Sequence, residues 1–152
     1  MTFLLDTDTL IFMIRGLKTR NQPNEIQRER TKVAQRIFQR ARRRQENRDL
    51  VAISAITVAE LEFGAWSCAD YQSEISAVRR ALAPFSLLSL DAHGCASHYG
   101  EIRRGLEAAG KPIGSQDTFI AAHALALDAT LVTNNRSEFS RVPALRCENW
   151  AV

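Results

Sequence analysis

The chain has 152 residues, of which 45% are hydrophobic and 24% are charged, as expected for one ordinary globular domain. No apolar run approaches the roughly 18 residues of a membrane-spanning helix, and Asp6 interrupts any signal-peptide core. We therefore expect a cytoplasmic protein that does not associate with membranes. The three cysteines form no CxxC pair, which argues against a zinc knuckle or a disulfide framework and favours buried free thiols.

The net charge of +3 hides an uneven distribution along the chain. From Arg15 to Arg48, 12 Lys and Arg residues stand against 3 acidic residues, a local charge of +9. The rest of the chain has 8 basic and 14 acidic residues, a charge of −6. A basic segment on an acidic body predicts a polyanion held on one side and cations held on the other. A solvated helix face, or a surface that meets another protomer, would explain the basic segment equally well.

The first half of the chain alternates short apolar runs with helical patterns. Residues 2–5 predict a strand, followed at once by a helix that we expect to end at Gly16. Apolar residues at helical spacing over residues 24–44 predict an amphipathic helix with a positive outer face. Residues 51–56 are almost continuously apolar, as in a strand that is covered on both faces, and Thr57 is expected to open the next helix.

The second half continues the same alternation. Helices are predicted over residues 71–82, 92–109 and 115–127, and strands over residues 85–90, 129–133 and 145–148. Gly110 followed by Pro112 is typical of a helix end. The alternation predicts an α/β fold with a mainly parallel central sheet of four to five strands flanked by helices.

Several acidic and amide side chains fall where these predicted strands end. Asp6 directly follows the first strand, and Asn134 and Asn135 follow the fourth. Glu60 and Asp117 are each expected in the first turn of a helix. Because parallel strands share one carboxyl edge, these side chains can meet there. Three gathered carboxylates would need a divalent cation, and an all-oxygen site favours Mg²⁺ or Mn²⁺.

Each acid also has a purely structural explanation. Asp6 or Asp8 could simply cap the first helix. Thr57 and Glu60 have the spacing of a capping box, and Asp117 would be favoured by the helix dipole alone. The spacing of the acids therefore leaves both the metal-site and the capping interpretations open.

Other polar and aromatic residues are weaker candidates. Thr133 could orient a water molecule, but a structural role suits it better. His123 lies six residues after Asp117 without metal-ligand spacing to a cysteine, so we expect it to be a packing or a surface residue. Phe63 and Trp66 share the predicted Glu60 helix at a spacing of three, which indicates either core or a dimer surface.

Four stretches in chain order resemble the PIN-domain ribonucleases, in particular the VapC-type toxins of bacterial toxin–antitoxin pairs. The stretches are FLLDTD at 3–8, ISAITVAELEFG at 53–64, GKPIGSQD at 110–117 with IAAHA at 120–124, and LVTNN at 131–135 with EF at 138–139. The second and third stretches are long and specific, whereas the first is weak by itself. The resemblance covers most of the chain and implies a single PIN-like domain over residues 1–152, with a basic helical segment at about 18–48.

The resemblance also implies a function. It implies that Asp6, Glu60 and Asp117 are metal ligands and catalytic residues for the Mg²⁺- or Mn²⁺-dependent hydrolysis of RNA. It further implies a cognate VapB-type antitoxin and a homodimer. Relatives commonly have Asn where this chain has Asp8, and the fourth acidic position of the family appears here as Asn135, a further catalytic candidate.

Two rival functions remain open. The DxDx pattern of Asp6 and Asp8 also fits a phosphatase of the haloacid dehalogenase type, with Asp6 as nucleophile and Asp8 as general acid. Such an enzyme needs a downstream lysine beside a second acidic pair, which Lys18, Lys32 and Lys111 do not supply. The third possibility is a non-catalytic RNA- or protein-binding module whose acids only cap helices.

Overall fold

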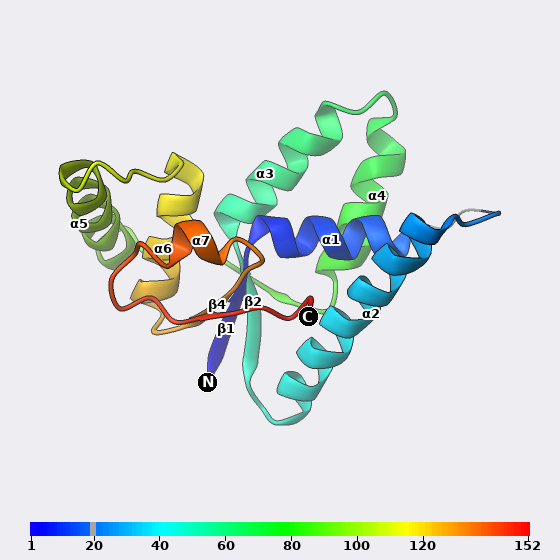
Figure 1. Cartoon of the computed structure of the whole chain (residues 1–152), viewed down its shortest axis with the longest axis horizontal. Helices are drawn as coiled ribbons and strands as arrows, with labels where there is room; N and C mark the ends of the chain where they lie inside the picture. The colour runs from blue at the N-terminus through cyan, green and yellow to red at the C-terminus, as the bar shows by residue number, and fades with distance from the viewer. Residues whose placement is uncertain (19–20) are drawn as a thin grey trace.

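A parallel five-stranded sheet forms the centre of the computed structural model, which describes residues 1–18 and 21–152 (Figure 1). Residues 19 and 20 of the predicted basic segment lie outside the described residues. The strands are β1 (Thr2–Leu5), β2 (Leu50–Ser54), β3 (Ser86–Leu88), β4 (Thr130–Val132) and β5 (Cys147–Glu148). Their order is β3-β2-β1-β4-β5, and every neighbouring pair is parallel. The predicted fold class is confirmed.

Helices cover both faces of this sheet (Figure 1). They are α1 (Thr7–Leu17), α2 (Glu25–Glu46), α3 (Ala55–Trp66), α4 (Tyr71–Leu82), α5 (Gly94–Ala108), α6 (Ser115–Ala126) and α7 (Arg136–Phe139). Phe3 and Leu5 point into a core with α1, α2, α3 and α4, whereas Leu4 points into a second core with α5 and α6. This alternation along β1 follows from the two-residue period of a strand. The first strand is therefore buried on both faces.

The start of α3 differs from the prediction. Strand β2 ends at Ser54, and α3 begins at Ala55 rather than at Thr57. The Ser54 hydroxyl accepts a hydrogen bond from the N–H of Ile56 at 3.2 Å, so Ser54 is the helix cap. The predicted capping box is wrong, and Glu60 lies in the second turn of the helix. A serine at the end of an apolar run stops the strand earlier than the run itself suggests.

Gly16 does not end α1, as the sequence suggested, but lies inside its last turn. A Cβ atom at this position would lie 2.3 Å from the Cβ of Ala34 and 2.5 Å from the backbone carbonyl oxygen of Arg30. Both neighbours belong to α2. The glycine is therefore needed because α1 and α2 cross in direct contact.

Burial corrects one further prediction. Cys95 is buried and Cys147 is half-buried, but Cys68 is exposed after the end of α3, so the expectation of buried thiols is wrong for Cys68. Among the described residues, no helix is both long and apolar enough to cross a membrane.

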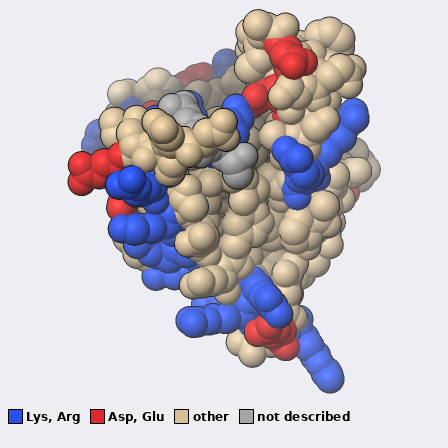
Figure 2. Space-filling model, turned by 90° about the vertical axis from the view of Figure 1, so that its right-hand side faces the viewer, with Lys and Arg blue, Asp and Glu red and all other residues tan. Residues whose placement is uncertain are grey.

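Helix α2 makes up most of the predicted basic segment. It begins one residue later and ends two residues later than the amphipathic helix predicted over residues 24–44. Its buried side chains recur at helical spacing, and its other side chains are largely basic. On the side of the molecule shown in Figure 2, Lys and Arg side chains gather in several groups rather than in one patch. Some basic side chains of α2 are paired with acids on the surface, such as Arg42 with Glu46 at 3.0 Å.

Candidate active site

Asp6 lies at the carboxyl edge of the sheet, directly after β1. Its backbone N–H donates to the carbonyl oxygen of Val132 in β4 at 3.0 Å, and its carboxylate accepts from the N–H of Thr9 at 2.8 Å. The side chain therefore caps α1, as the structural interpretation predicted. Asp6 is only 2% exposed, and this burial raises its pKa to about 6, against hydrogen bonds from Thr133 and Thr9 that lower it. A carboxyl group with such a pKa gains or loses its proton close to neutral pH.

Asp117 is the second acid at this edge, and it is half-buried. It lies in the first turn of α6, as predicted, at the third position after the Gly114 cap. Burial is the largest cause that raises the pKa of Asp117 to about 7, followed by a hydrogen bond with Glu138. The negative charges of Glu138, Asp6 and Asp8 add to the rise. Three other carboxyl groups, from the start of α1 and from α7, therefore lie within electrostatic range of Asp117.

Glu60 is held close to this cluster through Thr7. The Oγ1 atom of Thr7 donates to the Oε1 atom of Glu60 at 2.8 Å and lies 3.1 Å from the Oγ1 atom of Thr57. Thr7 is buried and stands between the two aspartates in the sequence. One hydroxyl group thus ties the second turn of α3 to the first residue of α1.

Asn135 reaches the acidic cluster through Glu138. Its side-chain Nδ2 donates to the Oε2 atom of Glu138 at 3.0 Å, and its Oδ1 accepts from the hydroxyl of Ser137 at 3.2 Å. Its backbone N–H donates to the Oγ1 atom of Thr133 at 2.9 Å. These contacts fix the start of α7 and orient Glu138 toward Asp117.

Glu138 is the site residue that the sequence reasoning missed. The family resemblance includes it only as part of the EF pair and does not single it out as a candidate. The three-residue distance from Asn135, in a segment that follows a strand, is the signal that could have found it. In the structure Glu138 forms the hydrogen bond with Asp117 that none of the other candidates makes.

The acids do not form a finished metal site as they stand. No group of three or more Asp, Glu, His or Cys side chains in the described part of the chain is arranged so that it could hold a metal ion. Asp6 and Glu138 lie close enough to Asp117 to raise its pKa. One carboxylate oxygen of Glu60 instead accepts a hydrogen bond from the Thr7 hydroxyl. Burial is the largest cause of the raised pKa values of Asp6 and Asp117, and no positively charged group is among the causes for either.

The weaker candidates behave as structural residues. The Nδ1 atom of His123 lies 2.8 Å from the hydroxyl of Ser54, and burial lowers the pKa of the imidazole. Its Nε2 atom has no hydrogen-bond partner within the described residues. His123 is therefore a core residue, which favours the packing interpretation over the surface one. Phe63 and Trp66 are 74% and 67% exposed, so the core interpretation of these two residues is wrong.

Comparison with known proteins agrees with this arrangement. The PIN domain family model matches residues 28–145. The chain belongs to the PIN-domain family. It is 34% identical over 150 residues to a tRNA(fMet)-specific endonuclease VapC of Salmonella typhimurium, covering 99% of this chain and 98% of the relative. It is 33% identical over 150 residues, with the same coverage, to a ribonuclease VapC1 of Haemophilus influenzae.

A solved structure of VapBC2 from Rickettsia felis, bound to a DNA fragment from their promoter, has the same fold. It superposes on this PIN domain with a TM-score of 0.80 and 32% sequence identity, and the match covers 99% of each chain. The resemblance to VapC-type PIN domains seen in the sequence is thus confirmed. The phosphatase interpretation of Asp6 and Asp8 is not favoured.

Proposed function

We propose that this PIN domain is the endoribonuclease toxin of a VapBC-type pair and that it hydrolyses phosphodiester bonds of RNA at the carboxyl edge of its sheet. The observation that carries the proposal is the pair of acids Asp6 and Asp117, which come from distant parts of the sequence. Both have raised pKa values, and the negative charge of Asp6 is among the causes of the rise at Asp117. Capping alone would not require two carboxyl groups to approach each other.

The donor set fits a divalent metal ion. PIN-domain ribonucleases generally depend on a divalent metal, and the oxygen donors here suit Mg²⁺ or Mn²⁺. Mg²⁺ usually keeps several waters and takes only one or two carboxylates, so a set of acids that is not closed in advance remains suitable. We propose Asp6, Glu60 and Asp117 as the ligands. When bound, such an ion lowers the pKa of a water molecule and polarises the phosphoryl oxygen.

The protein groups have separate tasks in this proposal. Thr133 donates a hydrogen bond that favours the ionised form of Asp6, and Thr7 holds Glu60 in place. Glu138 accepts a hydrogen bond from the protonated form of Asp117 and so stabilises that form. Asn135 holds Glu138 in position for this hydrogen bond. We therefore add Glu138 to the catalytic candidates Asp6, Glu60, Asp117 and Asn135.

The partners follow from the relatives. The structures of VapBC complexes support a VapB-type antitoxin that binds this chain and blocks its activity. An RNA substrate supports action in the cytoplasm. Because both cores share one sheet, we propose that residues 1–152 act as a single PIN domain, with α2 as the main part of its basic segment.

A homodimer is also part of the proposal. Phe63 and Trp66 expose large apolar side chains on α3, the helix that carries Glu60. A second copy of the chain would cover this surface and bring two active sites together. Light scattering of the purified chain tests it: a Phe63→Glu variant is expected to be monomeric at concentrations where the unchanged chain is a dimer.

Cleavage of pooled tRNA, rRNA and mRNA by the purified chain tests the main proposal. We expect cleavage with Mg²⁺ or Mn²⁺ and none in EDTA, and an Asp117→Asn variant should lose at least about a hundredfold in rate. Glu101→Gln is a matched control, because it makes the same chemical change at an exposed position of α5. Cleavage that persists in EDTA, or that survives in Asp117→Asn, would contradict the proposal.

A further inference from the structure

A cleft with a volume of ≈ 430 Å³ lies between the C-terminal half of α2 and the last strand of the sheet. Arg40, Arg43 and Arg44 of α2 form one wall, and Arg136 at the start of α7 forms part of the other. Glu148 of β5 is the only acidic side chain among its described lining residues. Four arginines and one glutamate give this arginine cleft a formal charge of +3.

Part of this charge is neutralised by the fold. Arg44 lies 3.7 Å from Asp49 and 3.6 Å from Glu148, and its guanidinium stands over the ring of Phe3 at 4.4 Å from the centroid. Arg44 therefore holds α2 against the sheet. Its positive charge is balanced by the two carboxylates beside it, so it adds little to the attraction of an outside anion.

The other three arginines keep their charge available. Arg40 donates one hydrogen bond to the carbonyl oxygen of Asn149 at 2.9 Å, which leaves most of its five N–H donors unused. Arg43 and Arg136 are exposed, and neither forms an ion pair with any residue that the structure describes. Three guanidinium groups thus line one cleft, and no carboxylate among the described residues is dedicated to them.

The arginine cleft adjoins the candidate active site. Arg136 directly follows Asn135, and the backbone N–H of Thr133 donates to the carbonyl oxygen of Glu148 at 2.9 Å. Burial raises the pKa of the Cys147 thiol, which lies between the two regions; the charge of Arg136 opposes this rise, and that of Asp6 adds to it. Cys147 lines the cleft, so the cleft begins within electrostatic range of the first acid of the site.

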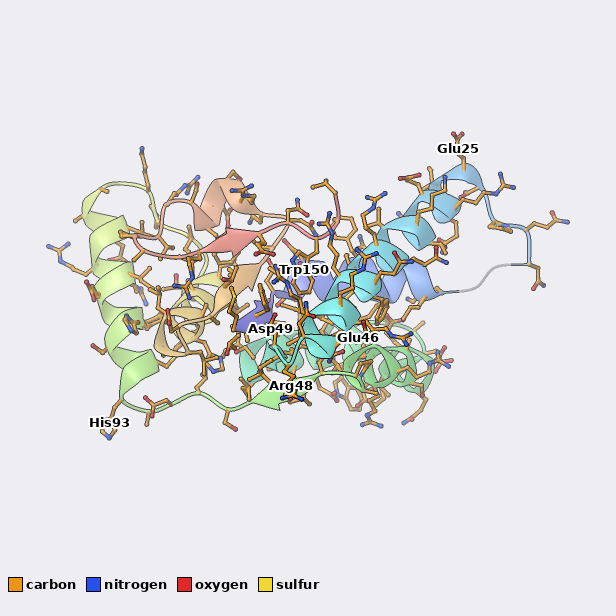
Figure 3. The ribbon with its side chains drawn as sticks, turned by 90° about the horizontal axis from the view of Figure 1, so that it is seen from below. Glu25, Glu46, Arg48, Asp49, His93 and Trp150 are labelled. Carbon is orange, nitrogen blue, oxygen red and sulfur yellow. The ribbon has the colours of Figure 1, made fainter. Side chains whose placement is uncertain are left out.

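The chain segment after β5 connects the two regions. In Figure 1 the last residues leave the sheet and end beside α2. Figure 3 shows Trp150 next to α2, where this segment reaches the helix. The Trp150 indole N–H donates to Glu148 at 2.7 Å, so the acid that lines the cleft is held by two partners, this indole and Arg44. An anion in the cleft would therefore be attracted by the arginines more strongly than it is repelled by Glu148.

We propose that the arginine cleft binds a phosphodiester group of the RNA strand that flanks the bond being cut. The proposal rests on the function proposed above and extends its binding surface from the acidic edge onto α2. Guanidinium groups bind phosphate oxygens in a bidentate manner, and backbone contacts of this kind position the strand without reading its sequence. The positive cleft beside the negative site would direct the polyanion across the edge where cleavage takes place.

A second basic cleft provides a matched control. It is larger, at ≈ 900 Å³, and lies between the end of α1, the start of α2 and α4. Among its described lining residues are Arg15, Lys18, Arg30, Arg80 and Glu74, so its formal charge is also +3. None of its described lining residues follows a strand at the carboxyl edge. Charge reversal at Arg80 therefore changes the net charge equally while leaving the arginine cleft intact.

The experiment compares Arg43→Glu with Arg80→Glu. Each is introduced into the Asp117→Asn background, so that a fluorescein-labelled 16-nucleotide single-stranded RNA stays intact while its binding is measured as a function of salt. We expect Arg43→Glu to weaken binding about tenfold and to reduce the slope of log Kd against log salt by roughly 0.7 for each phosphate that it no longer neutralises. Arg80→Glu should leave this slope unchanged. Circular dichroism of both variants checks that α2 and α4 remain folded.

Kinetics of the otherwise unchanged chain separate binding from catalysis. With the 16-nucleotide RNA, Arg43→Glu should raise KM about tenfold at constant kcat, whereas the shortest RNA that the unchanged chain cleaves should be cut equally well by both variants. Arg43→Gln should show an intermediate effect on KM. The pattern depends on substrate length, which a folding defect would not reproduce.

Three results would overturn the proposal. Equal RNA binding by Arg43→Glu and Arg80→Glu excludes the arginine cleft while leaving the ribonuclease function intact. Normal RNA binding together with loss of antitoxin binding in Arg43→Glu would assign the cleft to the protein partner instead. If the unchanged chain cleaves no RNA and its RNA binding does not depend on Arg43, both proposals are wrong.

Discussion

Replacing Asp117 by asparagine is expected to stabilise the metal-free chain at high pH. In the folded chain the pKa of Asp117 is raised from 3.8 to about 7, chiefly by burial and by a hydrogen bond with Glu138. The folded state therefore binds a proton more tightly than the unfolded state. The stability that this proton provides is complete below about pH 4 and is lost as the pH rises through about 7. At pH 8 the ionised carboxylate is a cost that asparagine does not have.

The size of the effect follows from the shift in pKa. A change from 3.8 to about 7 corresponds to a ceiling of about 4 kcal/mol at roughly 1.4 kcal/mol for each pKa unit. Asp117 is only half-buried and shares its charge with Glu138, so solvent screening reduces this ceiling, and we expect about 2 kcal/mol. In a chain of this size that corresponds to a rise in Tm of about 4–8 °C.

Thermal unfolding in EDTA between pH 4 and 8 measures this difference. Asp117→Asn should unfold at a higher temperature than the unchanged chain at pH 8, and the two should converge near pH 4. With saturating Mg²⁺ or Mn²⁺ the order should reverse, because the unchanged chain gains binding energy that the variant lacks. The exposed control Glu101→Gln should unfold at the same temperature as the unchanged chain, both in EDTA and with the metal. A variant that is less stable in EDTA at pH 8 would refute the idea that the ionised Asp117 carboxylate destabilises the metal-free fold.

Three further substitutions test other parts of the structure. Gly16→Ala should destabilise the chain by about 2 kcal/mol or more in chemical unfolding, because its Cβ atom would meet α2 at 2.3 Å, whereas Gly64→Ala has open space and should be neutral or slightly stabilising. Thr7→Val should lower kcat/KM for RNA about tenfold because the hydrogen bond to Glu60 is removed, and Thr7→Ser should retain most activity. Ser54→Ala should lower the free energy of unfolding by about 1–2 kcal/mol, because it removes the cap of α3; an unchanged stability would show that the cap is dispensable.

The elements that can be predicted from sequence are those with a strong periodic signal. The helix Tyr71–Leu82 has the predicted bounds, and the parallel sheet follows from apolar runs that alternate with helices. The start of α3 is misplaced by the same reasoning because Ile56 extends the apolar run beyond the strand, while the hydroxyl of Ser54 decides where the helix begins. A cap depends on one side-chain hydrogen bond, which periodicity does not contain.

Packing partners are equally invisible in the sequence. Gly16 suggests a helix end because glycine is common there, but its real constraint is the approach of α2 from 18 residues further along the chain. Phe63 and Trp66 have the spacing of buried residues, yet both side chains are largely exposed, and Trp66 only stacks on Tyr71 of α4. In each case the sequence pattern describes one helix, whereas burial is decided by a second one.

The fourth acid of the site combines both difficulties. The family resemblance assigns the fourth acidic position to Asn135, a neutral residue, and a helix of four residues such as α7 is too short to show a periodic pattern. In the structure the Asn135 amide holds Glu138, and Glu138 forms the hydrogen bond with Asp117. Glu138 thus supplies the negative charge that Asn135 lacks, from three residues further along the chain. Glu138→Gln should therefore reduce RNA cleavage more than Asn135→Ala, since the amide can only orient the carboxylate that interacts with Asp117.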